Sequence, residues 1–306
     1  MHTLIQAQQL QRRYGNHLAV DGLDIELCRG DILGFLGPNG AGKSTCMRML
    51  TGNLAPHGGR ILIDGLDLLE QPLQAKRNLG YLPETPPVYR EMQVDEYLQF
   101  AARLNAIPKA DCARAVDRAK QRCGLGDVGR RLIGNLSKGY QQRVGIAQAI
   151  IHDPMVVVLD EPTVGLDPNQ IREIRSLIRE LGEAHSVILS THILPEVQSI
   201  CNRVQIINQG RTVYSDRLSQ AEAAVETLQL RLQHPPGLAD LLALPGVDAA
   251  EEISQGHFQL RLAADAQIPA LAQRVVEHGW GLAALIPQQR TLEQIFVELT
   301  AGEVQA

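Results

Sequence analysis

The sequence predicts an α/β domain over residues 1–218, followed by a smaller α+β domain over residues 219–306. Three observations support this fold class. Apolar strand-like runs alternate with amphipathic helical segments, which is the pattern of a parallel sheet covered by helices. The run "VVVL" at Val156–Leu159 is continuous and β-branched, as is typical of a parallel strand buried on both faces. The pattern then changes after Leu218.

The elements of the first domain follow in chain order. The first 37 residues are β-rich and end in the apolar run "DILGFLG". A helix is expected over Ser44–Gly52, and "GGRILIDG" reads as a strand after a glycine turn. "PETPP" breaks the chain and helical patterns follow from Val94 to Ile133, so we expect a helical subdomain over about residues 85–152. The last elements are the strand "VVVL", the helix "IREIRSLIRELG", the strand "SVILS" and the β-rich segment "VQIINQGRTVYS".

The second domain has a βαββαβ order with one added helix. This order predicts a small ferredoxin-like α+β fold. Nothing in it suggests a catalytic set. Its expected elements are, in order, "LQLRL", "GLADLLALPG", "VDAAEEIS", "HFQLRLA", "IPALAQRVVEHG", "LAALIPQ" and "TLEQIFVELT".

Composition excludes several function classes. A hydrophobic fraction of 44% and a charged fraction of 21% are those of a globular protein with a buried core. The net charge is −5 and the pI is near 6.0, so no basic footprint points to nucleic acid. No apolar run approaches the roughly 18 residues of a membrane span, and the N-terminus lacks the apolar region of a secretory signal. Five scattered cysteines without a CxxC pair indicate a reducing cytosol, with no disulfide frame or zinc site.

The stretch "GPNGAGKST" fits the phosphate-loop pattern G-x-x-x-x-G-K-[ST] between a strand and a helix. Its glycines let backbone N–H groups approach phosphate oxygens at a helix N-terminus, which carries about half a positive charge. We expect Lys43 to reach the β- and γ-phosphates and Ser44 to ligate Mg²⁺. The alternative is a glycine-rich turn at a helix start. The candidate nucleotide ligands are Gly37, Pro38, Asn39, Gly40, Ala41, Gly42, Lys43, Ser44 and Thr45.

Acidic residues follow the buried strand in "MVVVLDEP". The strand delivers Asp160 to its carboxyl end, where open α/β sheets bind ligands. Asp160 is expected to hold Mg²⁺ through water, and Glu161 to polarise the attacking water. The alternative is an acidic helix cap before Pro162.

Two further residues complete the predicted site. The strand "SVILS" leads into His192, which is expected to contact the γ-phosphate and hold the attacking water, although a lone histidine is more often structural. Tyr14 in "RRYG" is the candidate to stack on the base, a contact worth about 1–3 kcal/mol. Its alternative is a partly buried strand tyrosine.

The segment "NLSKGYQQRVGIAQAI" opens a helix with Ser137, and spacing alone favours a capped helix without a ligand. The motifs together resemble a known family. The phosphate loop, "LSKGYQQRV", "LDEP", "VGLD" at Val164–Asp167 and His192 stand in the order found in ABC-type ATPases. The resemblance covers residues 2 to about 218 and implies the fold of a P-loop NTPase.

This resemblance implies that the helix start at Ser137 caps the ATP of a second, facing subunit. Ser137, Lys138, Gly139 and Asp167 are then nucleotide-binding residues across a head-to-tail homodimer with two composite ATP sites. It implies ATP and Mg²⁺ as cofactors. It also implies a separate polytopic permease, of the ABC-2 exporter type found with gliding-motility and multidrug exporter ATPase subunits. The chain is then cytoplasmic and peripheral on the inner face of the cell membrane.

The sequence departs from the family pattern in two places. Lys138 and Tyr140 stand where the LSGGQ signature has Gly and Gln. Glu84 in "GYLPE" stands where most relatives have a Gln that contacts Mg²⁺ and water. A glutamate can still ligate the metal, so Glu84 stays in the predicted metal set with Ser44 and Asp160. Its charge near Glu161 is expected to raise a carboxyl pKa there.

Two other readings compete with a transporter subunit. One is a soluble ABC ATPase of repair, translation or cluster assembly that moves no substrate. The chain carries one motif set and a short segment before Ser137, which favours the transporter. The other is a nucleotide switch without turnover, and Glu161 and His192 argue against it.

Overall fold

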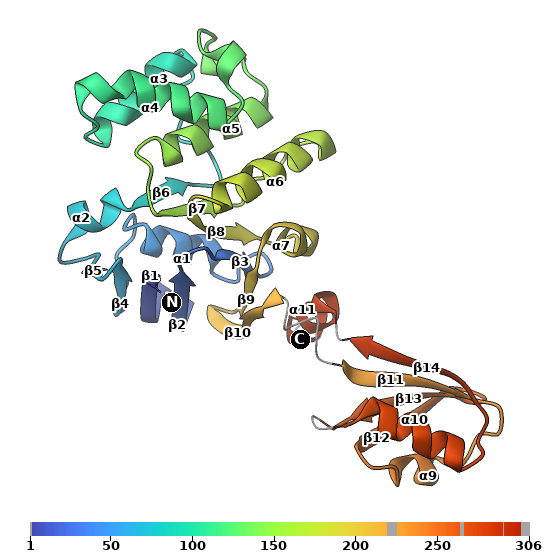
Figure 1. The fold of residues 1–306 in the computed structure, drawn as a ribbon. Helices are drawn as coiled ribbons and strands as arrows, with labels where there is room; N and C mark the ends of the chain where they lie inside the picture. Colours follow the sequence, from blue (N-terminus) through green and yellow to red (C-terminus); the bar gives the residue numbers. More distant parts are fainter. Residues whose placement is uncertain (1, 219–224, 264–265, 290, 301–306) are drawn as a thin grey trace. The chain divides into compact units, whose positions relative to one another are not determined.

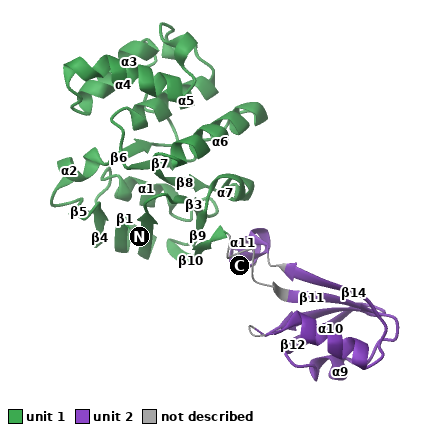
Figure 2. Ribbon diagram, viewed as in Figure 1, with its two compact units in different colours: residues 1–218, 302–306 green, residues 219–301 purple. Residues whose placement is uncertain are grey.

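The computed structural model describes residues 2–218, 225–263, 266–289 and 291–300, which belong to two compact units (Figures 1 and 2). The first unit ends at Leu218. The ends of the predicted second domain, 219 and 306, lie outside the described residues. Each unit mixes strands and helices, which confirms the predicted fold class.

The first unit is built on a six-stranded sheet in the order β10-β9-β3-β8-β7-β6. The five strands from β9 to β6 are parallel, and β10 pairs antiparallel with β9. A second, antiparallel sheet has the order β2-β1-β4-β5. The strands are β1 (Thr3–Tyr14), β2 (His17–Cys28), β3 (Ile32–Leu36), β4 (Gly58–Ile63), β5 (Leu66–Asp67), β6 (Leu79–Leu82), β7 (Val156–Asp160), β8 (Ser186–Thr191), β9 (Arg203–Asn208) and β10 (Arg211–Arg217).

Strand β7 is buried on both faces, as its continuous apolar run predicts. Val157 and Leu159 pack into a core shared with the helices that follow β6. Val156 and Val158 point the other way, into a core shared with the antiparallel sheet and the first helix. Because successive side chains of a strand alternate between faces, two cores hold this strand rigidly. The residue at its end is therefore placed with little freedom.

The helices of the first unit include a group of three between β6 and β7 (Figure 1). These three pack against one another, and their apolar faces close the core on one side of β7 and β8. The predicted helical stretch is thus observed. Among the helices that the structure describes, none has both the length and the apolar character to cross a bilayer. The helices are α1 (Lys43–Leu50), α2 (Pro72–Arg77), α3 (Val94–Leu104), α4 (Lys109–Arg122), α5 (Lys138–Ile150), α6 (Pro168–Gly182) and α7 (Leu194–Ile200).

The second unit is a four-stranded antiparallel sheet in the order β12-β13-β11-β14. With its strands numbered along the chain this is 2-3-1-4, the ferredoxin-like order that the βαββαβ pattern predicts. Leu230 of β11 and Phe258 of β13 pack with Leu271 of α10 in its core. Its elements are β11 (Val225–Leu232), α9 (Leu238–Leu242), β12 (Val247–Ser254), β13 (His257–Leu262), α10 (Ile268–Glu277), β14 (Leu282–Gln289) and α11 (Leu292–Thr300).

Candidate nucleotide site

The phosphate loop connects the end of β3 to the start of α1. Gly42 caps α1 with a φ of +102°, a left-handed conformation that side chains rarely adopt. A methyl group on Gly42 would also lie 2.4 Å from the carbonyl oxygen of Ala19. Only glycine fits at this position. The first turn of α1 therefore follows the loop directly, and its backbone N–H groups lie at the loop.

Lys43 is buried and makes three contacts through its ammonium group. Nζ donates to the carbonyl oxygens of Gly37, at 2.9 Å, and Pro38, at 3.2 Å. It also lies 3.3 Å from Oε1 of Glu161, whose side chain is buried as well. The Lys43 ammonium is thus held at the phosphate loop by these two carbonyl oxygens and by Glu161, the residue that follows Asp160.

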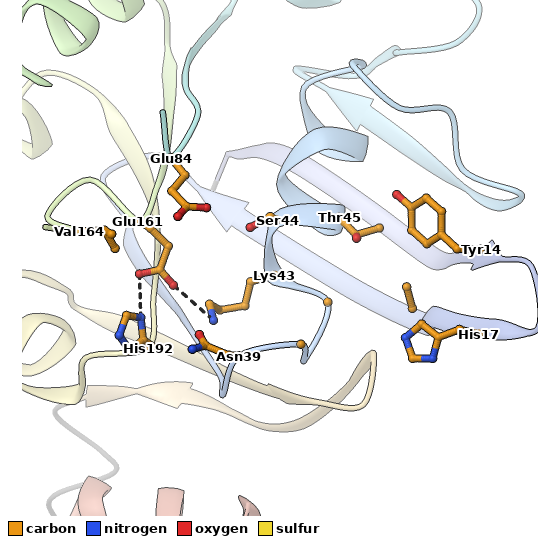
Figure 3. Close-up of a pocket in the computed structure, with 13 residues that line it drawn as sticks. Tyr14, His17, Asn39, Lys43, Ser44, Thr45, Glu84, Glu161, Val164 and His192 are labelled. Atoms are coloured by element: carbon orange, nitrogen blue, oxygen red, sulfur yellow. Dashed lines mark hydrogen bonds and ion pairs between the residues drawn. The ribbon is translucent and has the colours of Figure 1, made fainter. Parts of the chain in front are cut away.

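Glu161 joins two predicted catalytic residues through its two carboxylate oxygens (Figure 3). Oε1 faces Lys43, and Oε2 lies 2.9 Å from Nδ1 of His192. Glu161 has a φ of +47°, which is uncommon for a residue with a side chain and costs on the order of 1–3 kcal/mol. Its N–H donates to the carbonyl oxygen of Ser190 at 3.0 Å, which ties the segment after β7 to the end of β8.

Asp160 ends β7 and accepts a hydrogen bond of 3.3 Å from the hydroxyl of Ser44. Burial raises the pKa of Asp160 above its ordinary value of 3.8. The hydroxyls of Ser190 and Ser44 oppose this rise, and the negative charges of Glu161 and Glu84 add to it. The expected influence of Glu84 on a carboxyl pKa therefore falls on Asp160.

Lys43, Ser44, Glu161 and His192 line one cavity of about 450 Å³ (Figure 3). Of the predicted residues near it, Gly37, Pro38, Ala41 and Asp160 are not in its wall. Tyr14 stands on its rim with 44% of its surface exposed, and the guanidinium carbon of Arg12 lies 5.3 Å from the centre of its ring. His17, Ala19 and Val164 also line the cavity and are not among the predicted residues. The predicted residues in its wall are Tyr14, Asn39, Gly40, Gly42, Lys43, Ser44, Thr45, Glu84, Glu161 and His192.

The predicted ligands Ser137, Lys138, Gly139 and Asp167 lie at the starts of α5 and α6, away from this cavity. Ser137 and Asp167 line no part of this cavity and are exposed. Each caps a helix: the Ser137 hydroxyl accepts from the Tyr140 N–H at 3.4 Å, and Asp167 accepts from two N–H groups in the first turn of α6. Gly139 packs so closely on Gln170 that a methyl group there would lie 2.8 Å from its side chain. The starts of α5 and α6 therefore form one surface.

A second cleft of about 660 Å³ contains Glu84 and Lys138, two of the three residues that depart from the family pattern. Glu84 lines this cleft as well as the nucleotide cavity. Lys138 lines it from the start of α5, with its ammonium directly over Gly165. Tyr89 stands in the same wall and stacks edge-on against Phe100, with ring centres 5.7 Å apart.

Comparison with known proteins places this geometry in a family. The ABC transporter family profile matches residues 20–164. The bacitracin transport ATP-binding protein BcrA of Bacillus licheniformis is 33% identical over 308 residues, covering 99% of this chain and 99% of its own length. The chain belongs to the ABC transporter ATP-binding proteins. As a member of that family, it binds and hydrolyses ATP.

Two other similarities extend over most of this ABC transporter protein. The daunorubicin resistance ATP-binding protein DrrA3 of Streptomyces coeruleorubidus is 29% identical over 309 residues, covering 98% of this chain and 97% of its own. A solved structure of the ATP binding subunit of an ABC transporter is 29% identical with a TM-score of 0.65, covering 72% of this chain and 92% of its own. The reading as a soluble ATPase without a transport role is not favoured by these relatives.

The raised pKa of Asp160 predicts how replacing it changes stability. Because the native carboxyl binds its proton more readily than the unfolded one, its contribution to stability is lost as pH rises through the native pKa. In Mg²⁺-free buffer, Asp160→Asn should raise the thermal midpoint near neutral pH, since an amide oxygen still accepts from Ser44. The gain should shrink toward about pH 4. The exposed Glu180→Gln is the control, and a gain from Asp160→Asn that does not change with pH would contradict the assignment.

Proposed function

We propose that this chain is the ATPase subunit of an exporter and works as a head-to-tail homodimer. Each ATP is held between the phosphate loop of one copy and the Ser137 surface of the other. One observation carries the proposal: Lys43, Glu161 and His192 share a cavity, whereas Ser137 and Asp167 form a separate exposed surface of the described chain. A single copy thus has two half-sites that a second copy completes.

The first half-site binds the nucleotide through the loop and Tyr14. All nine loop residues from Gly37 to Thr45 wrap the phosphates, and the N–H groups at the start of α1 donate to them. Lys43 supplies the positive charge at the β- and γ-phosphates. The exposed ring of Tyr14 lies on the rim of the cavity, where an adenine base can stack on it.

The donor set at the end of β7 fits Mg²⁺. Ser44 and Asp160 are already within hydrogen-bond distance, and Glu84 lines the same cavity. Mg²⁺ prefers one or two carboxylates together with phosphate oxygens and water, rather than a cage of protein ligands. When bound, the ion neutralises phosphate charge.

Glu161 acts as the general base for the attacking water, a role typically worth about 10²–10⁴ in rate. Lys43 and His192 hold its two carboxylate oxygens and so fix its direction. With Nδ1 donating to Glu161, Nε2 of the neutral ring is an acceptor and can take a hydrogen bond from the attacking water beside the γ-phosphate. His192 thereby aligns the base with the phosphate under attack.

The second half-site closes on the ATP of the facing copy. The Ser137 hydroxyl and the N–H groups at the start of α5, that of Gly139 included, donate to the γ-phosphate. Lys138 adds positive charge to this surface. Asp167 meets the same interface from the start of α6. Binding of two ATP molecules thus clamps the dimer, and hydrolysis releases it.

The cleft between Glu84 and Lys138 is the surface that we assign to the permease. The segment from Thr85 to Glu91 lines it and connects the metal side of the site to the helical group. Tyr89 is 47% exposed, and exposed aromatic residues often anchor protein partners. The transport and resistance names of the relatives support the export direction, and we propose a permease of the ABC-2 type as the partner. A cytoplasmic position on the inner face of the membrane follows from that partner.

Glu161→Gln tests the assignment of the base. An amide cannot take the proton, so the variant should bind ATP, form a stable dimer and turn over at least about 100-fold more slowly. Light scattering with and without ATP measures the dimer, and phosphate release measures turnover. Turnover at the parent rate would show that Glu161 is not the base.

Mixing two inactive variants tests the composite site. Ser137→Ala and Lys43→Ala dimers each have two damaged sites, but a mixed dimer holds one intact site. Equimolar mixing should therefore restore ATP hydrolysis, up to one working site per mixed dimer. Lys43→Ala mixed with Glu161→Gln is the control, since both changes fall in the same half-site and no intact site forms. Absence of recovery in the first mixture alone would argue against the head-to-tail arrangement.

Capture from membranes tests the permease surface. The tagged chain should retain a polytopic membrane protein, and Tyr89→Ala should reduce this capture while leaving ATP binding unchanged. Leu73→Ala, which alters a side chain that is 81% exposed on α2, is the matched control. Equal capture by both variants would remove Tyr89 from the docking surface.

A further inference from the structure

Behind the nucleotide cavity lies a buried carboxylate that the site described above does not use. Glu196, in the first turn of α7, is fully buried. Its Oε1 accepts a hydrogen bond of 2.7 Å from Thr163, and its Oε2 accepts one of 2.8 Å from Thr191. Both threonines are buried as well. Arg175 of α6 supplies the opposite charge, with Nη2 at 3.4 Å from Oε1.

The positions of these two threonines indicate what the Glu196 carboxylate does. Thr163 follows Glu161 by two residues, and Thr191 directly precedes His192. The Thr163–Glu196–Thr191 bridge therefore joins the same two segments that the Glu161–His192 contact joins at the cavity.

We propose that Glu196 is a positioning residue for ATP hydrolysis. Its carboxylate fixes the separation between the segment carrying Glu161 and the strand end carrying His192, so that the general base is held in line. The inference rests on the proposed function, because it assigns a role to the partners of Glu161 in that reaction.

Physical reasons favour a positioning device at this place. A buried carboxylate is costly unless hydrogen bonds and a countercharge satisfy it, so its partners are held firmly once it is in place. Glu161 has a left-handed backbone, which persists only where the surroundings fix it. The bond from Thr163 acts two residues beyond that strained position, and the bond from Thr191 fixes the strand end that accepts the Glu161 N–H nearby.

The partners of this carboxylate connect it to the surface proposed to face the second copy. Arg175 belongs to α6, which begins beside its cap Asp167. Thr163 opens the turn that leads to Asp167, and its carbonyl oxygen accepts from the Leu166 N–H at 3.2 Å. Glu196 thus connects the segment that carries Glu161, the proposed base of one site, with the turn that leads to Asp167. Asp167 is the residue proposed to meet the nucleotide bound by the second copy.

The test compares Thr163→Val with Thr163→Ser. Valine keeps the shape but removes the hydroxyl, whereas serine keeps the hydroxyl. We expect Thr163→Val to lower kcat by about tenfold or more, with KM for ATP within about twofold of the parent, because binding does not depend on the direction of Glu161. Thr163→Ser should retain most of the parent kcat. Ser176→Ala, which removes an exposed hydroxyl–carboxylate bond to Glu180 on α6, is the matched control.

A second variant separates positioning from general damage. In the Glu161→Gln background, Thr163→Val should lower the residual rate little further, because a residue that acts through Glu161 has nothing left to position. The thermal midpoint and ATP-dependent dimer of each variant show that it folds and binds. Parent-like kcat in Thr163→Val, or an equal fold-loss in both backgrounds, would overturn the proposal. Failure of the parent chain itself to turn over ATP would instead count against the proposed function.

Discussion

The nucleotide site depends on one buried carboxylate that is shared between two other side chains. Glu161 comes from the end of β7, Lys43 from the start of α1 and His192 from the end of β8, and they meet within 3.3 Å and 2.9 Å. Leaving a buried charge without its partner costs several kcal/mol. The three elements therefore gain this interaction only when they are docked together. Formation of the sheet and formation of the site are one event.

The starts of α1, α5 and α6 share one physical feature but differ in the groups that satisfy it. Every helix begins with N–H groups that lack partners within the helix. At α1 the cap is Gly42, which contributes no side-chain hydrogen bond, so the first-turn donors stay free for an anion. At α5 and α6 the side chains of Ser137 and Asp167 engage some of these donors. The three starts thus differ in their caps, since α1 has no side-chain cap whereas α5 and α6 each present a polar side chain at the first turn.

Much of the site could be predicted because its residues follow buried strands. Asp160 and His192 each follow a short apolar run. The carboxyl ends of these two strands can therefore be predicted from the sequence alone. Strand β6, with four residues, was not predictable in this way, although it places Glu84. Its strand state comes from pairing with β7, which only the folded chain supplies.

The bridge through Glu196 was hidden for a different reason. In the sequence Glu196 is an acid in the first turn of a short helix after Pro195, which is an ordinary place for an exposed carboxylate. The hydrogen bond from Thr163 to Glu196 joins residues 33 positions apart, so no local sequence pattern predicts it. Glu196 follows His192 by four residues, which is a spacing that places both near the end of β8. This spacing indicates a contact only when the ends of β8 and the burial of α7 are known.

Two of the three residues that depart from the family pattern, Glu84 and Lys138, are better understood together than apart. Taken singly, Glu84 adds a negative charge beside the proposed Mg²⁺ site and Lys138 adds a positive charge to the start of α5. In the structure both line the same cleft, whose wall also holds Arg90 and Glu91. The two changes have opposite sign, so they leave the formal charge of that cleft unaltered. A substitution that looks disruptive in the linear motif is therefore balanced in space, and the surface proposed for the permease keeps two acids and two bases.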